Sequence, residues 1–157
     1  MAIKDVISPE CIAKYFILRA TDDGELITPL KMQKMVYFAY AVYLLQKKGK
    51  DKLFQEKIEA WPSGPVVPSL YRKLKKYGSS PIKETFADIS IKDFLKKYSS
   101  IKDLLDEVYD KCQSLSAFQL VAITHNEKSW LEARKDLEPH ESSNKPLNDN
   151  DILSEYA

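Results

Sequence analysis

Apolar residues recur at helical spacing along most of this chain. Between residues 101 and 112 they fall at i, i+3, i+4, i+7, i+8 and i+11, which predicts an amphipathic helix. Ser8-Pro9 and Thr28-Pro29 each place a hydroxyl N-cap before a first-turn proline, so helices are expected to begin there. Further helices are expected over residues 66–77, from residue 90, from residue 116 and over residues 129–137. The pattern therefore favours a mainly α fold.

The segment from Leu30 to Gln46 differs from the other helical segments because it is apolar on nearly every side. A helix of this kind is packed by neighbouring elements around most of its circumference. We therefore expect a compact helical bundle built around this central apolar helix.

A small β element is expected in two short stretches, near residues 57–61 and 81–89. The first stretch is too short for a helix before Pro62 and predicts a strand. Residues 62–65, Pro-Ser-Gly-Pro, predict a turn, and Trp61 ahead of it is expected to be a core side chain. Because no linker or repeat interrupts the pattern, we expect one domain over residues 1–157.

The composition is that of a globular chain: 157 residues, 44% hydrophobic, with a net charge of +1. This length supports a packed core, and the low net charge argues against disorder. No apolar run approaches the roughly 18 residues that span a bilayer, and no apolar leader opens the sequence. Cys11 and Cys112 form no disulfide framework. We expect a cytoplasmic protein with no membrane partner.

The near-neutral total hides a separation of charge along the chain. Residues 31–83 carry 12 basic and 3 acidic side chains, whereas residues 84–157 carry 9 basic and 15 acidic ones. This asymmetry indicates either an acidic partner or complementarity between the two parts of the chain.

Signatures of catalysis are sparse. The sequence has no glycine-rich phosphate loop and no nucleophile elbow, and the spacing of His125 and His140 fits no common metal site. Cys112 and His125 are a weak candidate for a catalytic pair. Cys112 completes an apolar helical stripe, which predicts that its side chain is buried. We therefore expect no enzyme, with no catalytic, cofactor-binding or metal-binding residues.

A second interpretation comes from the basic run Arg72-Lys73-Leu74-Lys75-Lys76, which Tyr71 and Tyr77 flank. Basic side chains interleaved with aromatic ones are able to contact phosphates. The alternative function is therefore a nucleic-acid-binding accessory or regulatory protein of phage origin, although a solvated helix face is the commoner explanation of such a run.

Three elements of the sequence are informative together. Residues 30–40 read LKMQKMVYFAY, residues 58–71 read IEAWPSGPVVPSLY, and Thr124-His125 precedes Trp130. In this order they resemble the L-K-L-Q-K-L-x-Y, E-A-W-x-x-G-P-V and T-H-x-x-x-x-W elements of the Panacea domain, the SocA-like antitoxin domain of bacteria and their phages. Methionine replaces leucine at positions 32 and 35, and Ser129 stands where a proline often precedes the tryptophan.

This resemblance implies a non-enzymatic antitoxin that neutralises a cognate toxin by direct protein–protein contact, the toxin being encoded next to it. Some members of the family act as adaptors that deliver the toxin to a Clp-type protease. The resemblance implies no cofactor, and nucleic acid is not the expected partner. The residues that match the family motifs, and so are candidates for partner binding, are Lys31, Gln33, Lys34, Tyr37, Trp61, Gly64, Pro65, Val66, Tyr71, Thr124, His125 and Trp130.

Overall fold

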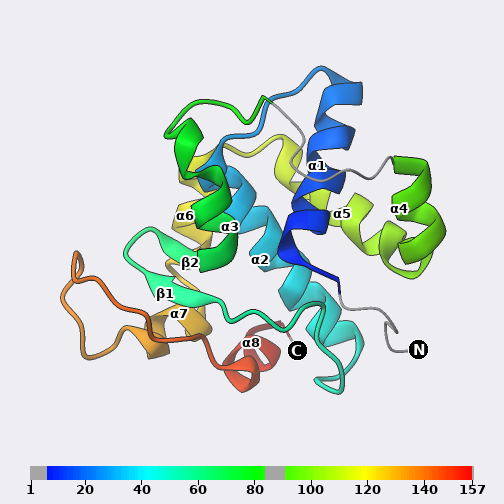
Figure 1. Ribbon diagram of the computed structural model, residues 1–157. Coiled ribbons are helices and arrows are strands. Elements are labelled where there is room, and N and C mark those ends of the chain that lie inside the picture. The colour runs from blue at the N-terminus through cyan, green and yellow to red at the C-terminus, as the bar shows by residue number, and fades with distance from the viewer. Residues whose placement is uncertain (1–6, 84–90, 157) are drawn as a thin grey trace.

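The fold of the computed structural model is described for residues 7–83 and 91–156 (Figure 1). Helices dominate it and a two-stranded sheet completes it, so the predicted mainly α class is confirmed. The elements in chain order are α1 (Pro9–Asp23), α2 (Pro29–Gln46), β1 (Glu59–Trp61), β2 (Gly64–Val66), α3 (Pro68–Leu74), the 3-10 turn η1 (Lys75–Tyr77), α4 (Ile91–Tyr98), the 3-10 turn η2 (Ser99–Ile101), α5 (Lys102–Gln113), α6 (Ala117–Thr124), α7 (Lys128–Ala133) and α8 (Asp149–Tyr156).

Helix α2 is the centre of the bundle, as its apolar circumference predicts (Figure 1). It packs against α1, α3, α5, α6, α8 and β2. Met32, Val36 and Tyr37 are completely enclosed. Within the described residues, the helices are too short or too polar to cross a bilayer.

The predicted starts of α1 and α2 agree with the structure because they rest on local capping chemistry. The hydroxyl of Ser8 accepts from the backbone N–H of Cys11, and that of Thr28 accepts from Lys31. Gly24 ends α1 in the left-handed region, with φ of 70°.

Two helices differ from the prediction at both of their ends. The helix expected over residues 66–77 begins only at Pro68, and it tightens into a 3-10 turn after Leu74. Helix α7 begins at Lys128 and ends at Ala133, so the expected range of 129–137 is late at both ends. Helix termini often fray or tighten in this way, because their last carbonyls lack partners.

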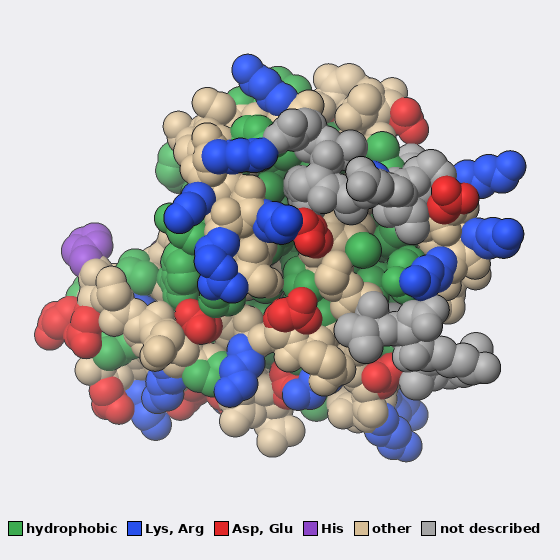
Figure 2. Space-filling model, in the orientation of Figure 1, with side chains coloured by type: hydrophobic (Ala, Val, Ile, Leu, Met, Phe, Trp, Pro, Cys, Tyr) green, Lys and Arg blue, Asp and Glu red, His purple; other side chains and the backbone are tan. Residues whose placement is uncertain are grey.

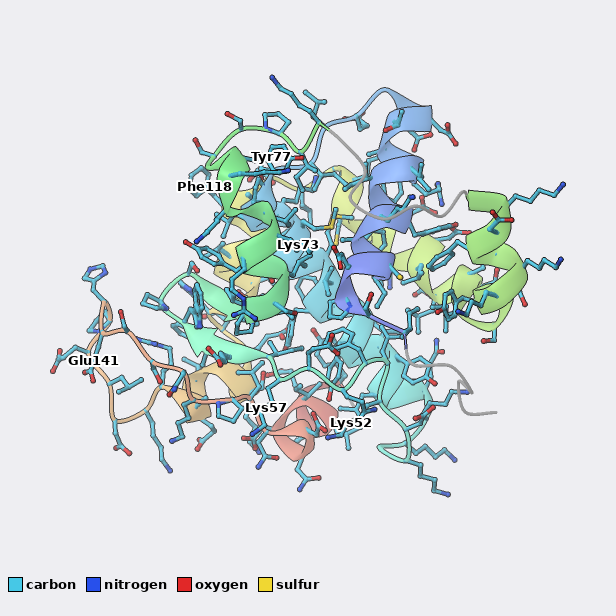
Figure 3. The ribbon with its side chains drawn as sticks, in the orientation of Figure 1. Lys52, Lys57, Lys73, Tyr77, Phe118 and Glu141 are labelled. Atoms are coloured by element: carbon cyan, nitrogen blue, oxygen red, sulfur yellow. The ribbon has the colours of Figure 1, made fainter. Side chains whose placement is uncertain are left out.

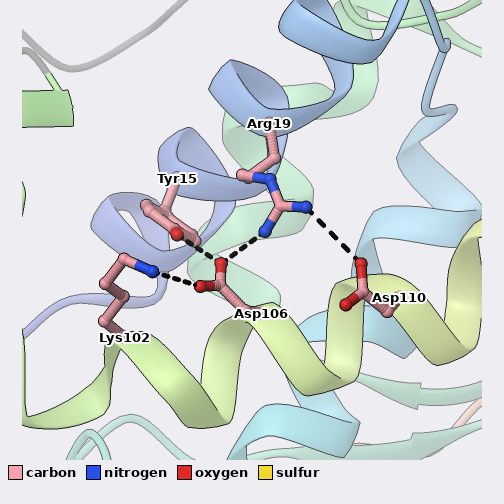
Figure 4. Close-up of polar contacts among 5 residues, drawn as sticks. All are labelled: Tyr15, Arg19, Lys102, Asp106 and Asp110. Atoms are coloured by element: carbon pink, nitrogen blue, oxygen red, sulfur yellow. Dashed lines mark hydrogen bonds and ion pairs between the residues drawn. The ribbon is translucent and has the colours of Figure 1, made fainter.

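A polar network joins α1 to α5 (Figure 4). Asp106 of α5 accepts hydrogen bonds from Tyr15 and Arg19 of α1 and from Lys102 one turn earlier. Partial burial alone would raise the pKa of Asp106, but these hydrogen bonds outweigh burial and hold the pKa below its usual value. The guanidinium of Arg19 also lies 4.5 Å from the ring centroid of Tyr109. The network orients α1 along α5.

The β element is a hairpin, and this corrects part of the prediction. The strand expected at residues 57–61 is confirmed as β1, but its partner is β2, in antiparallel register with Glu59 opposite Val66. The expected second piece at 81–89 is wrong for residues 81–83, which form no strand, and residues 84–89 lie outside the described residues. Residues 64 and 65 therefore belong to a strand where a turn was expected.

The segment before α8 lies against the outer side of β1. The N–H of Ala60 donates to the carbonyl of Lys145 at 2.9 Å, and the N–H of Leu147 donates to the carbonyl of Ile58 at 2.8 Å. Asp149, at the start of α8, pairs with Lys52 at 3.4 Å. This pair is one contact between the basic and the acidic parts of the chain, as internal charge complementarity predicts.

Candidate functional site

Two neighbouring side chains of α2 hold the hairpin in place. The Nε2 of Gln33 donates to the carbonyl of Val67 at 3.2 Å, and its Oε1 accepts from the N–H of Val67 at 2.9 Å. The Nζ of Lys34 donates to the carbonyl of Pro65 at 3.0 Å. Both side chains are buried. They satisfy backbone groups that the small sheet leaves open, as buried polar groups require.

Gly64 allows this close approach of the hairpin to α2. Its φ is +110°, and a Cβ built there would lie 2.8 Å from the Oγ1 of Thr124 and 3.0 Å from the Cε of Lys34. Both neighbours are enclosed side chains with no exposed surface. Glycine at position 64 therefore serves both backbone conformation and packing.

Lys34 is an unusual residue for an interior position. Its side chain is completely buried, and burial lowers the pKa of the ammonium group to about 7. Near neutral pH a substantial fraction of Lys34 is therefore uncharged in the folded protein.

His125 and Trp130 form a ring stack beside the hairpin. Their ring centroids lie 4.1 Å apart with an interplanar angle of 16°, and the Nε1 of Trp130 donates to the carbonyl of Trp61 at 2.8 Å. Burial lowers the pKa of His125, and repulsion from Lys34 adds to this, while the carbonyl of Pro62 opposes it. The spacing of five residues thus places an imidazole and an indole face to face over the end of β1.

Arg134 is a site residue that the sequence interpretation missed. Its guanidinium is buried and donates to the carbonyl of Ala60 at 2.8 Å, of Glu138 at 3.0 Å and of Glu141 at 2.7 Å. Arg134 therefore connects β1 to the loop that follows α7. The one sequence signal was its position one helical turn after Trp130, where two side chains share a face.

A buried carboxylate links α2, α7 and α8. Glu127 accepts from the hydroxyl of Tyr37 at 2.5 Å and from that of Tyr156 at 2.6 Å. The Oγ of Ser129 lies 3.2 Å from the Tyr37 hydroxyl. Burial raises the pKa of Glu127 even though both tyrosine hydrogen bonds lower it. Tyr37 is one of the motif residues, whereas no sequence motif predicts a role for Glu127 or Tyr156.

Not every motif residue joins this cluster. Lys31 points elsewhere and donates to the carbonyl of Gln113 in α5 at 3.3 Å. Tyr71 is 44% exposed, and its ring meets that of Trp61 edge-on at 4.9 Å between centroids.

The expectation that Trp61 is a core side chain is wrong, because the indole is only partly buried. Trp61 lines two surface pockets, one beside α3 and one beside residues 142–144, so part of its indole stays accessible.

The candidate catalytic pair gains no support. Cys112 is buried, and burial raises the pKa of its thiol to about 11 even though Lys31 opposes this. A thiol of this kind is a poor nucleophile at neutral pH. Across residues 7–83 and 91–156, no group of three or more His, Cys, Asp or Glu side chains is arranged to hold a metal ion.

The site is therefore a scaffold in which side chains from α2 and α7, together with Arg134 just after α7, hold the hairpin through hydrogen bonds to its backbone. A mainly helical domain whose E-A-W-x-x-G-P-V hairpin is held by these hydrogen bonds defines the class of protein. Residues 32–131 match the family described as "Antitoxin SocA-like, Panacea domain". The chain belongs to this family.

The chain is 31% identical over 105 residues to "Antitoxin SocA" of Caulobacter vibrioides (strain NA1000 / CB15N), an overlap that covers 63% of this chain and 55% of the relative. The chain thus spans about half the length of that relative. No solved structure matches the chain.

Proposed function

We propose that this chain is an antitoxin that neutralises a cognate toxin by binding it directly. Membership of the SocA-like family and the likeness to a protein named Antitoxin SocA support this proposal. We further propose that the toxin is encoded by a neighbouring reading frame.

The observation that carries the proposal is the use the structure makes of its motif residues. The motif residues Gln33 and Lys34, together with Arg134 outside the motifs, are buried and bonded to backbone carbonyl or amide groups. Buried side chains that are hydrogen-bonded to the backbone support a rigid surface and are not available to act on a substrate. A preorganised surface lowers the entropic cost of protein–protein association.

The test is growth of cells that express the product of the neighbouring reading frame, with and without this chain. We expect arrest by the neighbour alone, rescue by the chain, and co-purification of the two proteins. An unrelated toxin under the same promoter is the control and should not be neutralised. Arrest that persists, with no complex recovered, would contradict the proposal.

Delivery to a Clp-type protease is a separable step, which the family resemblance implies for some members. Direct neutralisation predicts that rescue persists in cells that lack the Clp protease, with the toxin still present and bound. Rescue that requires the protease, together with disappearance of the toxin, would replace direct neutralisation by the adaptor function.

A further inference from the structure

A groove of about 280 Å³ runs between the N-terminal turns of α2, the hairpin and α3. Its walls are largely apolar, and they include Leu30, Trp61, Val66, Tyr71 and Leu74. The volume lies near the lower end for a small-molecule pocket, and it suits one or two large side chains of a partner.

Two aromatic side chains stand at the mouth of this groove. The rings of Trp61 and Tyr71 pack edge-on, and each remains partly accessible. Aromatic side chains at a rim of this kind are typical anchors of protein interfaces. The position of Trp61 is also fixed, since its Nε1 donates to Glu59 at 2.9 Å and its carbonyl accepts from Trp130.

The rim beside the groove is positively charged. Figure 2 shows Lys and Arg side chains gathered over α3, and Figure 3 labels Lys73 and Tyr77 in the α3–η1 segment. Lys73 pairs with Glu10 at 3.3 Å. Arg72 and Lys75 are exposed, and neither forms an ion pair within the described part of the chain. Lys75 lines the groove itself. These two cations are therefore available to an acidic partner.

We propose that this groove is the toxin-binding site, and that it receives an acidic segment of the toxin. An apolar side chain of that segment inserts between Trp61 and Leu74, and its carboxylates pair with Arg72 and Lys75. The inference rests on the proposed antitoxin function. Charge complementarity selects an acidic partner, and the apolar walls select a polypeptide, because phosphates would engage the cations and leave the groove unfilled.

The test uses the full chain and the purified product of the neighbouring reading frame. The double variant Arg72→Glu/Lys75→Glu reverses the rim charge, and Tyr71→Ala removes the aromatic wall. Lys92→Glu/Lys96→Glu is the matched control, because both lysines are exposed on α4. Circular dichroism and thermal melting first establish that each variant is folded. Calorimetric titration at low and high salt then measures the affinity of each variant for the toxin.

We expect each groove variant to bind the toxin at least about tenfold more weakly, and the control to bind within about twofold of wild type. Wild-type affinity should fall as salt increases, and the rim variant should lose or reverse this dependence, because salt screens the repulsion between its glutamates and an acidic segment. If the toxin binds both groove variants as tightly as wild type, the groove assignment is overturned and the proposed function stands. If wild type binds no toxin, both fail.

A labelled short DNA duplex serves as the second probe. We expect no retention of the duplex by wild type at physiological salt. Retention that the rim variant abolishes, with toxin affinity unchanged, would make the basic rim a nucleic-acid surface and would overturn the inference.

Discussion

The buried Nζ of Lys34 donates to the carbonyl oxygen of Pro65 at 3.0 Å and so joins the central helix to the second strand. Burial lowers the pKa of Lys34 to about 7, whereas an unfolded lysine titrates near 10.5. Between these values the unfolded chain binds more protons at this position than the folded chain. Stability from this group is therefore full above pH 10.5 and is lost as the pH falls through 7.

The variant Lys34→Met should lose this pH dependence. For wild type we expect Lys34 to add up to about 1.4 kcal/mol per pH unit to the free energy of unfolding between pH 7 and 10. The difference between the two proteins isolates Lys34 from other titrating groups. Urea denaturation across this range measures it, with Lys96→Met as the exposed control. Parallel pH profiles for wild type and Lys34→Met would show that position 34 does not couple protonation to folding.

Gly64→Ala should destabilise the protein more than Gly24→Ala does. Both glycines have positive φ, but a Cβ at position 64 meets Thr124 and Lys34, whereas one at position 24 meets no atom within 4 Å. We expect a loss of about 3 kcal/mol at position 64 and about 1 kcal/mol at position 24. Chemical denaturation measures both values. Equal losses would mean that the hairpin does not depend on close contact with α2.

Arg134→Lys should not preserve stability, although it keeps the charge. The guanidinium reaches three carbonyl groups from one buried position, and an ammonium group has no such fork. We expect a loss of about 2 kcal/mol in the free energy of unfolding. Lys135→Ala is the neighbouring exposed control, and it should stay within about 0.5 kcal/mol. A fully stable Arg134→Lys protein would show that the loop is held by other contacts.

Cys112 should react slowly with a disulfide reagent in the folded protein. Burial covers the thiol and raises its pKa to about 11, so at pH 8 only about one thiol in a thousand is ionised. In a Cys11→Ser variant, we expect labelling at pH 8 to be at least about a hundredfold slower than in denaturant. Similar rates in both conditions would indicate an accessible, reactive Cys112.

The sequence predicts those features of the fold that depend on local chemistry. Ser8 and Thr28 act as N-caps because a hydroxyl at that position reaches a backbone N–H three residues on. The apolar circumference of α2 predicts its central place, since such a helix needs neighbours on all sides.

The features that the sequence did not predict depend on contacts with distant backbone groups. Pro65 is typical of a turn, yet it lies in β2 opposite Ala60, and the distant Lys34 donates to its carbonyl. Arg134 bonds to carbonyls, which carry no side-chain signature. The apolar groove likewise arises only when Leu30, Trp61 and Tyr71 are brought together from three elements.

The most direct test of the antitoxin account is gel filtration of the purified chain mixed with the purified product of the neighbouring reading frame. We predict that the two proteins leave the column together as one complex and that toxicity is lost in the same fractions. If the two proteins elute separately at the protein concentrations that neutralise toxicity in cells, direct binding as the mechanism is contradicted.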